Sequence, residues 1–121
     1  MSYDNNNIFA KILRNEIPCN KIYEDEFVLS FYDINPQKKI HALVIPKGKY
    51  IDLDDFNSKA SDKEIVGLLK GISIVAKKLG ISLDVGKGYR VLSNLSEDGG
   101  QEVPHLHFHL FGGEKVGKMV Q

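Results

Sequence analysis

The segment "HLHFHLF", residues 105–111, constrains the fold more than any other part of the chain, because it alternates histidine with large apolar residues. Successive side chains of a β-strand point to opposite faces, so a strand here places His105, His107 and His109 on one face. The apolar residues between them are expected to pack on a core, and the imidazole face is expected to be exposed. Only four histidines occur in 121 residues, which makes this row a candidate functional site.

Four other segments have the composition of β-strands. Two strands are expected around an acidic turn within residues 20–33, a largely buried strand over residues 39–47, and another over residues 89–95. The polar segment 96–101 is expected to be a loop that leads into the histidine strand. Strands joined mostly by hairpins, together with separate helices, predict an α+β domain with a five-stranded antiparallel sheet.

Two helices are predicted, one short and one long. The short one is expected within residues 7–18 and the long one between Ser61 and Gly80, where Ser61 and Glu64 form a capping box. The apolar stripe of the long helix consists of Ile65, Leu68, Leu69, Ile72, Val75, Ala76 and Leu79.

Composition bounds the class of protein. A chain of 121 residues, 42% of them hydrophobic, suits one domain over residues 1–121, with a flexible N-terminus at residues 1–7 and a C-terminal tail at residues 114–121. Sixteen Lys and Arg balance sixteen Asp and Glu, so neither nucleic acid nor an anionic membrane is expected as a partner. One cysteine, with no secretory or membrane-spanning apolar run, predicts a cytoplasmic protein.

The histidine row has three interpretations: a metal site, a catalytic site or a solvated polar face. In a regular strand His105 and His109 lie about 13 Å apart, so one zinc ion cannot bind both. His105 and His107 with His41 remain a zinc alternative, but no familiar ligand spacing supports it, and we predict neither a metal nor a cofactor. The chain is rich in lysine, glutamate and serine, which would serve an ordinary polar face equally well.

Catalysis is therefore the preferred interpretation of the row. Imidazole is a nucleophile and a proton carrier near neutral pH, and a partly protonated row also stabilises negative charge. Both properties suit attack on a phosphoryl centre. Just upstream, Gly99 and Gly100 can present backbone N–H groups to an anion, and Asn94 and Gln101 add side-chain donors. The alternative for this segment is an ordinary hairpin loop.

These motifs resemble a known family. "HLHFHLF" resembles the signature of the histidine triad (HIT) superfamily, and "NLSEDGGQEVPHLHFHL" resembles its Hint branch of nucleoside phosphoramidases. The likeness continues upstream through "IFAKILRNEIP", "IYEDE", "FYDINPQ" and "HALVIPK" in the family's order, and covers about residues 8 to 113. In animal members of this branch a serine that helps at the phosphate commonly occupies the position of Glu102. An acidic side chain pointing inward there would repel phosphate, so Glu102 is expected to face the leaving group or solvent.

The resemblance implies a homodimer whose two five-stranded sheets join into one. The exposed edge of a sheet and the stripe of the long helix also need more cover than a small monomer provides. The implied activity is hydrolysis of purine nucleoside 5′-phosphoramidates, conjugates of AMP or GMP, through a nucleotidyl-histidine intermediate. A dinucleoside polyphosphate hydrolase, a non-catalytic nucleotide-binding module and a zinc-binding regulator are the alternatives.

The resemblance also implies a role for each site residue. His107 is the nucleophile, His105 orients it, His109 contacts phosphate and assists the leaving group, and His41 lies against the nucleophile. Asp33 would bind the ribose hydroxyls, although an aspartate before "INP" is also a common turn former. The expected phosphate contacts are Asn94, Gly100, Gln101 and the N–H of Val103. The expected base slot consists of Ile8, Phe9, Ile12, Phe31 and Ile34, which at helical or strand spacing are equally suited to a core.

Overall fold

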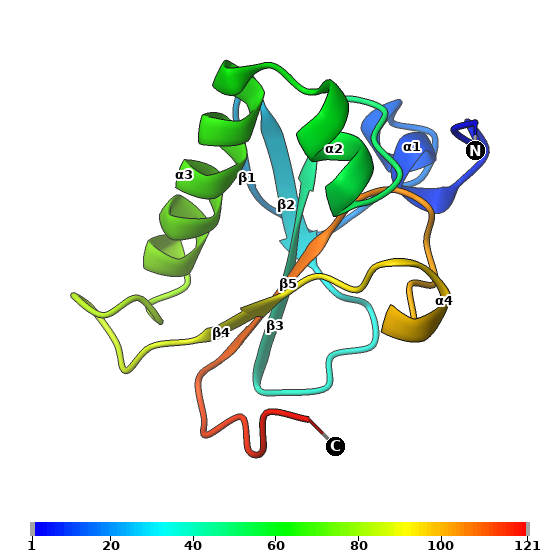
Figure 1. Cartoon of the computed structure of the whole chain (residues 1–121). Coiled ribbons are helices and arrows are strands. Elements are labelled where there is room, and N and C mark those ends of the chain that lie inside the picture. Colours follow the sequence, from blue (N-terminus) through cyan, green and yellow to red (C-terminus); the bar gives the residue numbers. More distant parts are fainter. Residues whose placement is uncertain (1, 121) are drawn as a thin grey trace.

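The computed structural model describes residues 2–120, which form a five-stranded antiparallel sheet with helices on both faces (Figure 1). The strands are β1 (Lys21–Glu24), β2 (Val28–Tyr32), β3 (Ile40–Pro46), β4 (Arg90–Leu92) and β5 (Phe108–Gly112), in the spatial order β1-β2-β3-β5-β4. The helices are α1 (Ile8–Leu13), α2 (Leu53–Lys59), α3 (Asp62–Lys78) and α4 (Ser96–Gly99). The predicted α+β class and five-stranded antiparallel sheet are confirmed.

The central strands are covered on both faces, which explains the continuous apolar run in β3. Ala42 and Val44 lie in the core cluster on the α3 face, whereas Leu43 and Ile45 lie in the cluster that contains Phe9 of α1. All four β3 residues are buried. A strand with two buried faces loses its polar alternation, and here the only polar interruption is His41.

Helix α3 forms where the sequence predicts it. Ser61 is the N-cap, and its side chain accepts a hydrogen bond from the backbone N–H of Glu64. The Glu64 carboxylate in turn accepts a hydrogen bond from the backbone N–H of Ser61. The helix ends at Lys78 with Leu79 as its C-cap, and Gly80 takes a positive φ of 74° just beyond it. The predicted capping box and glycine stop are both confirmed.

Two of the four helices are absent from the sequence prediction, which expected one short and one long helix. Helix α2 is capped by Asp52, whose side chain accepts a hydrogen bond from Asp55 N, but only Phe56 is buried within the helix. One buried apolar residue in seven gives no periodic stripe to detect. Residues 96–99, expected to be a loop, form one helical turn that ends at Gly100 with a φ of 74°.

The histidine strand is shorter than predicted. Strand β5 begins only at Phe108, and the N–H of Leu106 donates to the carbonyl of Tyr50 at 2.8 Å instead of joining the sheet ladder. His105 and His107 therefore precede the strand. Both are buried, so the expectation of an exposed imidazole face is wrong for these two residues. The cover comes from α1 and the N-terminal segment, which lie on that face.

The N-terminal segment, predicted to be flexible, makes specific contacts. The Asn7 side chain caps α1 by accepting from Ala10 N at 2.9 Å and donates to the Asp4 carbonyl at 2.8 Å. The Tyr3 hydroxyl lies 2.6 Å from Nδ1 of His105. At the other end, the Arg90 guanidinium donates to backbone carbonyls of the C-terminal tail. No helix within residues 2–120 is long and apolar enough to cross a membrane.

Candidate functional site

The four histidines gather on the face of the sheet that α1 covers. His109 on β5 lies opposite Leu43 on β3, and His41 lies opposite Phe111, so the sheet register brings the two imidazoles together. The ring centroids of His41 and His109 are 5.2 Å apart, and those of His109 and His107 are 5.1 Å apart. The predicted row is thus a contiguous cluster with His109 at its centre.

His107 is held by a backbone carbonyl. Its Nδ1 lies 2.7 Å from the carbonyl oxygen of His105, which can only accept, so Nδ1 carries the proton and Nε2 keeps its lone pair. The ring of Phe9 meets His107 edge to face with centroids 5.0 Å apart. Burial lowers the pKa of His107 from 6.5, so the ring is neutral at pH 7. A neutral imidazole with a fixed tautomer and a free Nε2 is a competent nucleophile.

His105 is fully buried and fixed at both ring nitrogens. Its Nε2 donates to the carbonyl of Pro46 at 2.9 Å, which leaves Nδ1 as an acceptor for the Tyr3 hydroxyl at 2.6 Å. Burial lowers the pKa of His105 to about 4. This histidine is therefore a neutral anchor whose main-chain carbonyl holds the ring of His107.

His41 and His109 form a directional hydrogen-bonded pair. The backbone N–H of Gln37 donates to Nδ1 of His41 at 3.2 Å, so the proton of His41 is on Nε2. That nitrogen lies 2.9 Å from Nδ1 of His109, which must accept, and so Nε2 of His109 carries a proton. Burial, and secondarily the charges of His107 and His41, lower the pKa of His109 to about 4.

The position of His41 differs from the expectation that it lies against the nucleophile. Its hydrogen-bond partner is His109, and it reaches His107 only through that ring. Burial lowers the pKa of His41, while the nearby Asp33 carboxylate opposes the shift. His41 is thus both a satisfied core histidine and a member of the imidazole network.

Phe111 is a site residue that the sequence analysis missed. Its ring stacks parallel to His109 with centroids 5.8 Å apart, and lies 4.3 Å from the centroid of His41. The signal was present, because Phe111 continues the two-residue alternation of the histidine row. Tyr3 and the backbone N–H of Gln37 are further contacts that no local pattern identifies.

One group of side chains has the spacing of a metal site. Ligand atoms of Asp33, His41 and His109 lie within 4.8 Å of one another. The hydrogen bond from Gln37 N to Nδ1 of His41, however, keeps the proton on Nε2, the nitrogen that faces the other two residues. A metal there would force the proton onto Nδ1, against the Gln37 N–H. The donor set suits a proton network better than a resident metal.

Comparisons with known proteins identify the family. Residues 14–116 match the HIT domain family. The chain belongs to this family. It is 53% identical over 119 residues to a HIT-like protein of Azospirillum brasilense. This match covers 98% of the present chain and 95% of the relative.

Solved structures of HIT proteins share the fold. A HIT family hydrolase from Clostridium thermocellum matches with a TM-score of 0.85 and 37% identity, over 96% of this chain and 97% of that chain. A histidine triad nucleotide-binding protein from Candida albicans matches with a TM-score of 0.75 and 35% identity, over 86% and 72% respectively. The sheet and the histidine cluster of the present chain therefore form a HIT-like fold.

Asp33 lies beside the HIT histidine cluster and also forms a turn. Its Oδ1 accepts a hydrogen bond from Asn35 N at 2.8 Å, and its Oδ2 lies 3.5 Å from Nε2 of His41. The turn-forming alternative is thus observed. It does not exclude ribose binding, because the Oδ2 atom has only a long contact to the imidazole.

The glycine segment before the triad is internally bonded. Gly100 ends α4, and the Gln101 amide donates to the carbonyls of Ile51 at 2.7 Å and Val103 at 3.0 Å. Its side-chain oxygen accepts from Ser96 N. Gln101 therefore shapes this segment, and its expected phosphate contact would require one of these bonds to break. Asn94 is half-buried just before this segment, between β4 and α4.

The expected base-slot residues divide into two groups. Phe9, Ile12 and Phe31 are buried in the core cluster on the α1 face, as the core alternative requires. Ile8 and Ile34 are 42% and 85% exposed and remain free to contact a ligand.

Glu102 is exposed next to the HIT triad. Burial lowers the pKa of His107, whereas the negative charges of Asp33 and, more weakly, Glu102 raise it. The Glu102 carboxylate is thus close enough to influence the charge of His107. Val103 beside it packs against the core cluster of α1.

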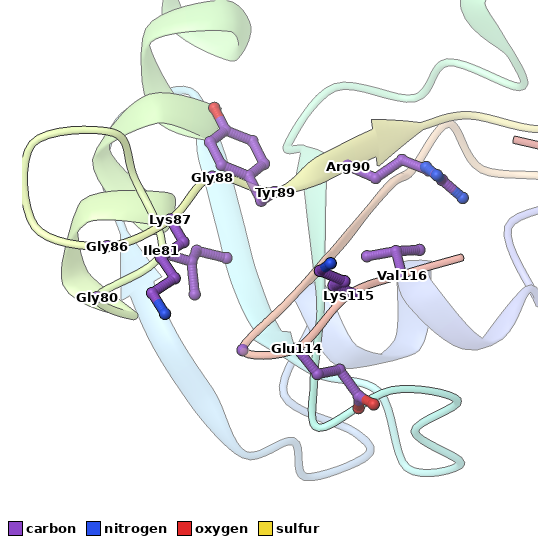
Figure 2. Close-up of a pocket in the computed structure, with 11 residues that line it drawn as sticks. Gly80, Ile81, Gly86, Lys87, Gly88, Tyr89, Arg90, Glu114, Lys115 and Val116 are labelled. Carbon is purple, nitrogen blue, oxygen red and sulfur yellow. The ribbon is translucent and has the colours of Figure 1, made fainter. Parts of the chain in front are cut away.

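A separate cavity of about 700 Å³ lies at the end of the sheet near the start of β4 and the C-terminal tail (Figure 2). Figure 2 shows Tyr89 and Arg90 on one side of it and tail residues 114–116 on another. None of the four histidines lines this cavity. The candidate active site of this HIT protein is therefore defined by the geometry of its imidazoles.

Proposed function

We propose that this protein hydrolyses purine nucleoside 5′-phosphoramidates, or related nucleotidyl conjugates, to the nucleoside monophosphate. The observation that carries the proposal is the arrangement of two adjacent imidazoles of opposite polarity: His107 presents an Nε2 lone pair and His109 an Nε2 proton. The names of the two solved relatives, a HIT family hydrolase and a nucleotide-binding protein, support the same reaction class.

In the first step, Nε2 of His107 attacks phosphorus as the bond between phosphorus and the leaving nitrogen breaks. The leaving nitrogen takes the Nε2 proton of His109, so an amine departs and a nucleotidyl-histidine remains. The neutral pair of His41 and His109 must first gain a proton, which enters at Nδ1 of His41 and displaces the Gln37 N–H, because the other nitrogens of the pair already hold its two protons. The negative charge of the bound phosphate raises the pKa of these rings and recruits that proton from solvent.

In the second step, water replaces the histidine. A water molecule gives a proton to His109 as its oxygen attacks phosphorus, the bond to Nε2 of His107 breaks, and the nucleoside monophosphate is released. The carbonyl of His105 accepts the Nδ1–H bond throughout and stabilises the positive charge that develops on His107.

Substrate binding is assigned to groups around the cluster. Asp33 accepts hydrogen bonds from the ribose hydroxyls, and exposed Ile8 and Ile34 contact the base. Asn94 and the backbone N–H groups of Gly100 and Val103 bind the phosphate. AMP or GMP conjugates are the expected substrates.

The decisive experiment follows both product and intermediate. Incubation with adenosine 5′-monophosphoramidate should release AMP, and rapid acid-free quenching should show protein carrying one nucleoside monophosphate by intact mass. His107→Ala should lower turnover by many orders of magnitude and show no adduct, because it deletes the covalent route. His109→Ala should still form the adduct and lose about 10²- to 10⁴-fold in rate, the loss typical of a proton donor.

His107→Asn is the matched control, since its amide can still donate to the His105 carbonyl while the nucleophile is gone. It should fold like the wild type and be as inactive as His107→Ala. An adduct that persists in either variant would refute the assignment of His107. Faster cleavage of a dinucleoside tetraphosphate than of the phosphoramidate would instead place the chain with the polyphosphate hydrolases.

A further inference from the structure

Tyr3 reaches the catalytic cluster from the far end of the chain. Its hydroxyl lies 2.6 Å from Nδ1 of His105, 102 residues away in sequence. The two rings also pack edge to face, with centroids 5.6 Å apart and an interplanar angle of 74°. Nε2 of His105 is already bonded to Pro46, so the Tyr3 hydroxyl is the group that completes the polar contacts of this buried ring.

The polarity of the Tyr3 contact is determined by its neighbours. The Pro46 carbonyl can only accept, which places the single proton of neutral His105 on Nε2. Nδ1 is then an acceptor, and the Tyr3 hydroxyl donates to it. Burial raises the pKa of Tyr3, so the hydroxyl keeps its proton across the neutral range. Without this donor, a fully buried nitrogen would lose its partner.

The contact is transmitted to His107 through one peptide carbonyl. The His105 ring is bonded to the end of β3 on one side and to the N-terminal segment on the other, and its carbonyl accepts from Nδ1 of His107 at 2.7 Å. The same segment continues through Asn7, which caps α1, to Phe9, which packs on His107. Residues 3–9 thus contact both histidines.

We infer that Tyr3 is a positioning residue for the nucleophile, which it controls through the orientation of His105. The inference rests on the proposed function, in which His107 attacks phosphorus. A nucleophile must be held within a fraction of an ångström of its productive position, and outer hydrogen-bond partners provide that restraint. The N-terminal segment is therefore part of the active-site structure.

The test replaces only the hydroxyl. Tyr3→Phe keeps the ring that packs on His105 and should lower kcat by about 10- to 100-fold, the loss typical when the hydrogen-bond partner that orients a functional histidine is removed, with KM nearly unchanged. Tyr23→Phe is the matched control, because it removes a tyrosine hydroxyl bonded to Asp25 on the β1–β2 turn. It should leave kcat unchanged.

A second measurement is independent of activity. Nitrogen NMR of the histidine rings should show wild-type His105 protonated at Nε2 alone and His107 protonated at Nδ1 alone. In Tyr3→Phe the Nδ1 signal of His105 should shift because this nitrogen loses its hydrogen-bond donor, while Nε2 stays protonated against the Pro46 carbonyl, and the Nδ1 proton of His107 should exchange faster with water. These changes should be absent in Tyr23→Phe.

The outcomes separate the two proposals. A wild-type protein that does not cleave the phosphoramidate, but whose ring signals change in Tyr3→Phe, would refute the proposed reaction and support control of the histidines by Tyr3. A Tyr3→Phe variant with wild-type kcat and unchanged ring signals would overturn the inference. A loss of kcat matched by the same loss in Tyr23→Phe would also overturn it, since it would reflect stability alone.

Discussion

At the scale of single residues, burial sets the charge of the imidazoles in the candidate site. Burial lowers the pKa of each of the four histidines, to about 4 for His105 and His109. A row that was expected to be partly protonated is therefore neutral in the free protein at pH 7. In the proposed mechanism neutrality suits His107 as the nucleophile, whereas His109, the proposed proton donor, is charged by the approach of an anionic substrate.

Asp33 offers a residue-scale test of ribose binding. Asp33→Ala should weaken binding of AMP by on the order of 1 to 3 kcal/mol, the loss of charge-assisted hydrogen bonds. Asp33→Asn keeps an oxygen that can accept from Asn35 N and so preserves the turn. Calorimetric titration should show weaker binding in both variants. Wild-type affinity in Asp33→Asn would identify Asp33 as a turn residue without a ribose role.

At the scale of secondary-structure elements, the packing of α3 on the sheet depends on a glycine. A Cβ atom at Gly71 would lie 2.9 Å from Cγ2 of Val28, a fully buried residue of β2. Because the valine is fully buried, a larger residue at position 71 must displace either its side chain or the helix. Gly71 thus sets the distance between α3 and β2.

Gly71→Ala should therefore destabilise the protein although alanine favours a helix. The intrinsic gain is about 1 kcal/mol, against about 1 to 3 kcal/mol for overpacking, so we expect a net loss of about 1 kcal/mol. In a Val28→Ala background the clash is gone, and the same substitution should stabilise. Urea unfolding of all four proteins gives the coupling. Additive effects would show that Val28 does not restrict Gly71.

At the scale of the whole molecule, the buried histidines couple stability to pH. The unfolded chain protonates His105 near pH 6.5, whereas the folded chain does so only near pH 4. As pH falls through this window the unfolded state binds more protons, so the free energy of unfolding should decrease. For His105 alone the decrease is about 2 kcal/mol between pH 7 and pH 5 and about 3 kcal/mol over the whole window. Urea unfolding at pH 7, 6 and 5 measures this. Equal stabilities at pH 7 and 5 would contradict neutral burial.

Assembly into a homodimer remains a prediction at this scale. Strand β4 is an edge of the sheet, and its Val91 is 43% exposed. Leu69, a member of the predicted apolar stripe of α3, is 60% exposed, so no other part of the described chain buries it. Sedimentation at micromolar concentration should give the mass of two chains, and Val91→Lys should shift it toward one. A single-chain mass for the wild type would refute the dimer.

The helices and strands that could be predicted from the sequence alone are those specified by residues close together in the chain. The capping box of Ser61 and Glu64 identified α3, and the alternation through His109 identified a strand with two different faces. These features hold because helix caps and strand pleats are formed within a few residues of chain. The family resemblance added candidate roles for Asp33 and the histidines.

Only the tertiary structure decided the state of each imidazole nitrogen. The partners of His105 come from Tyr3 and Pro46, and that of His41 Nδ1 from the backbone of Gln37, none of which the histidine pattern could indicate. Burial of the row likewise depends on α1, nearly a hundred residues upstream in sequence. Protonation and orientation follow from desolvation and long-range hydrogen bonds, which exist only once distant segments have packed together.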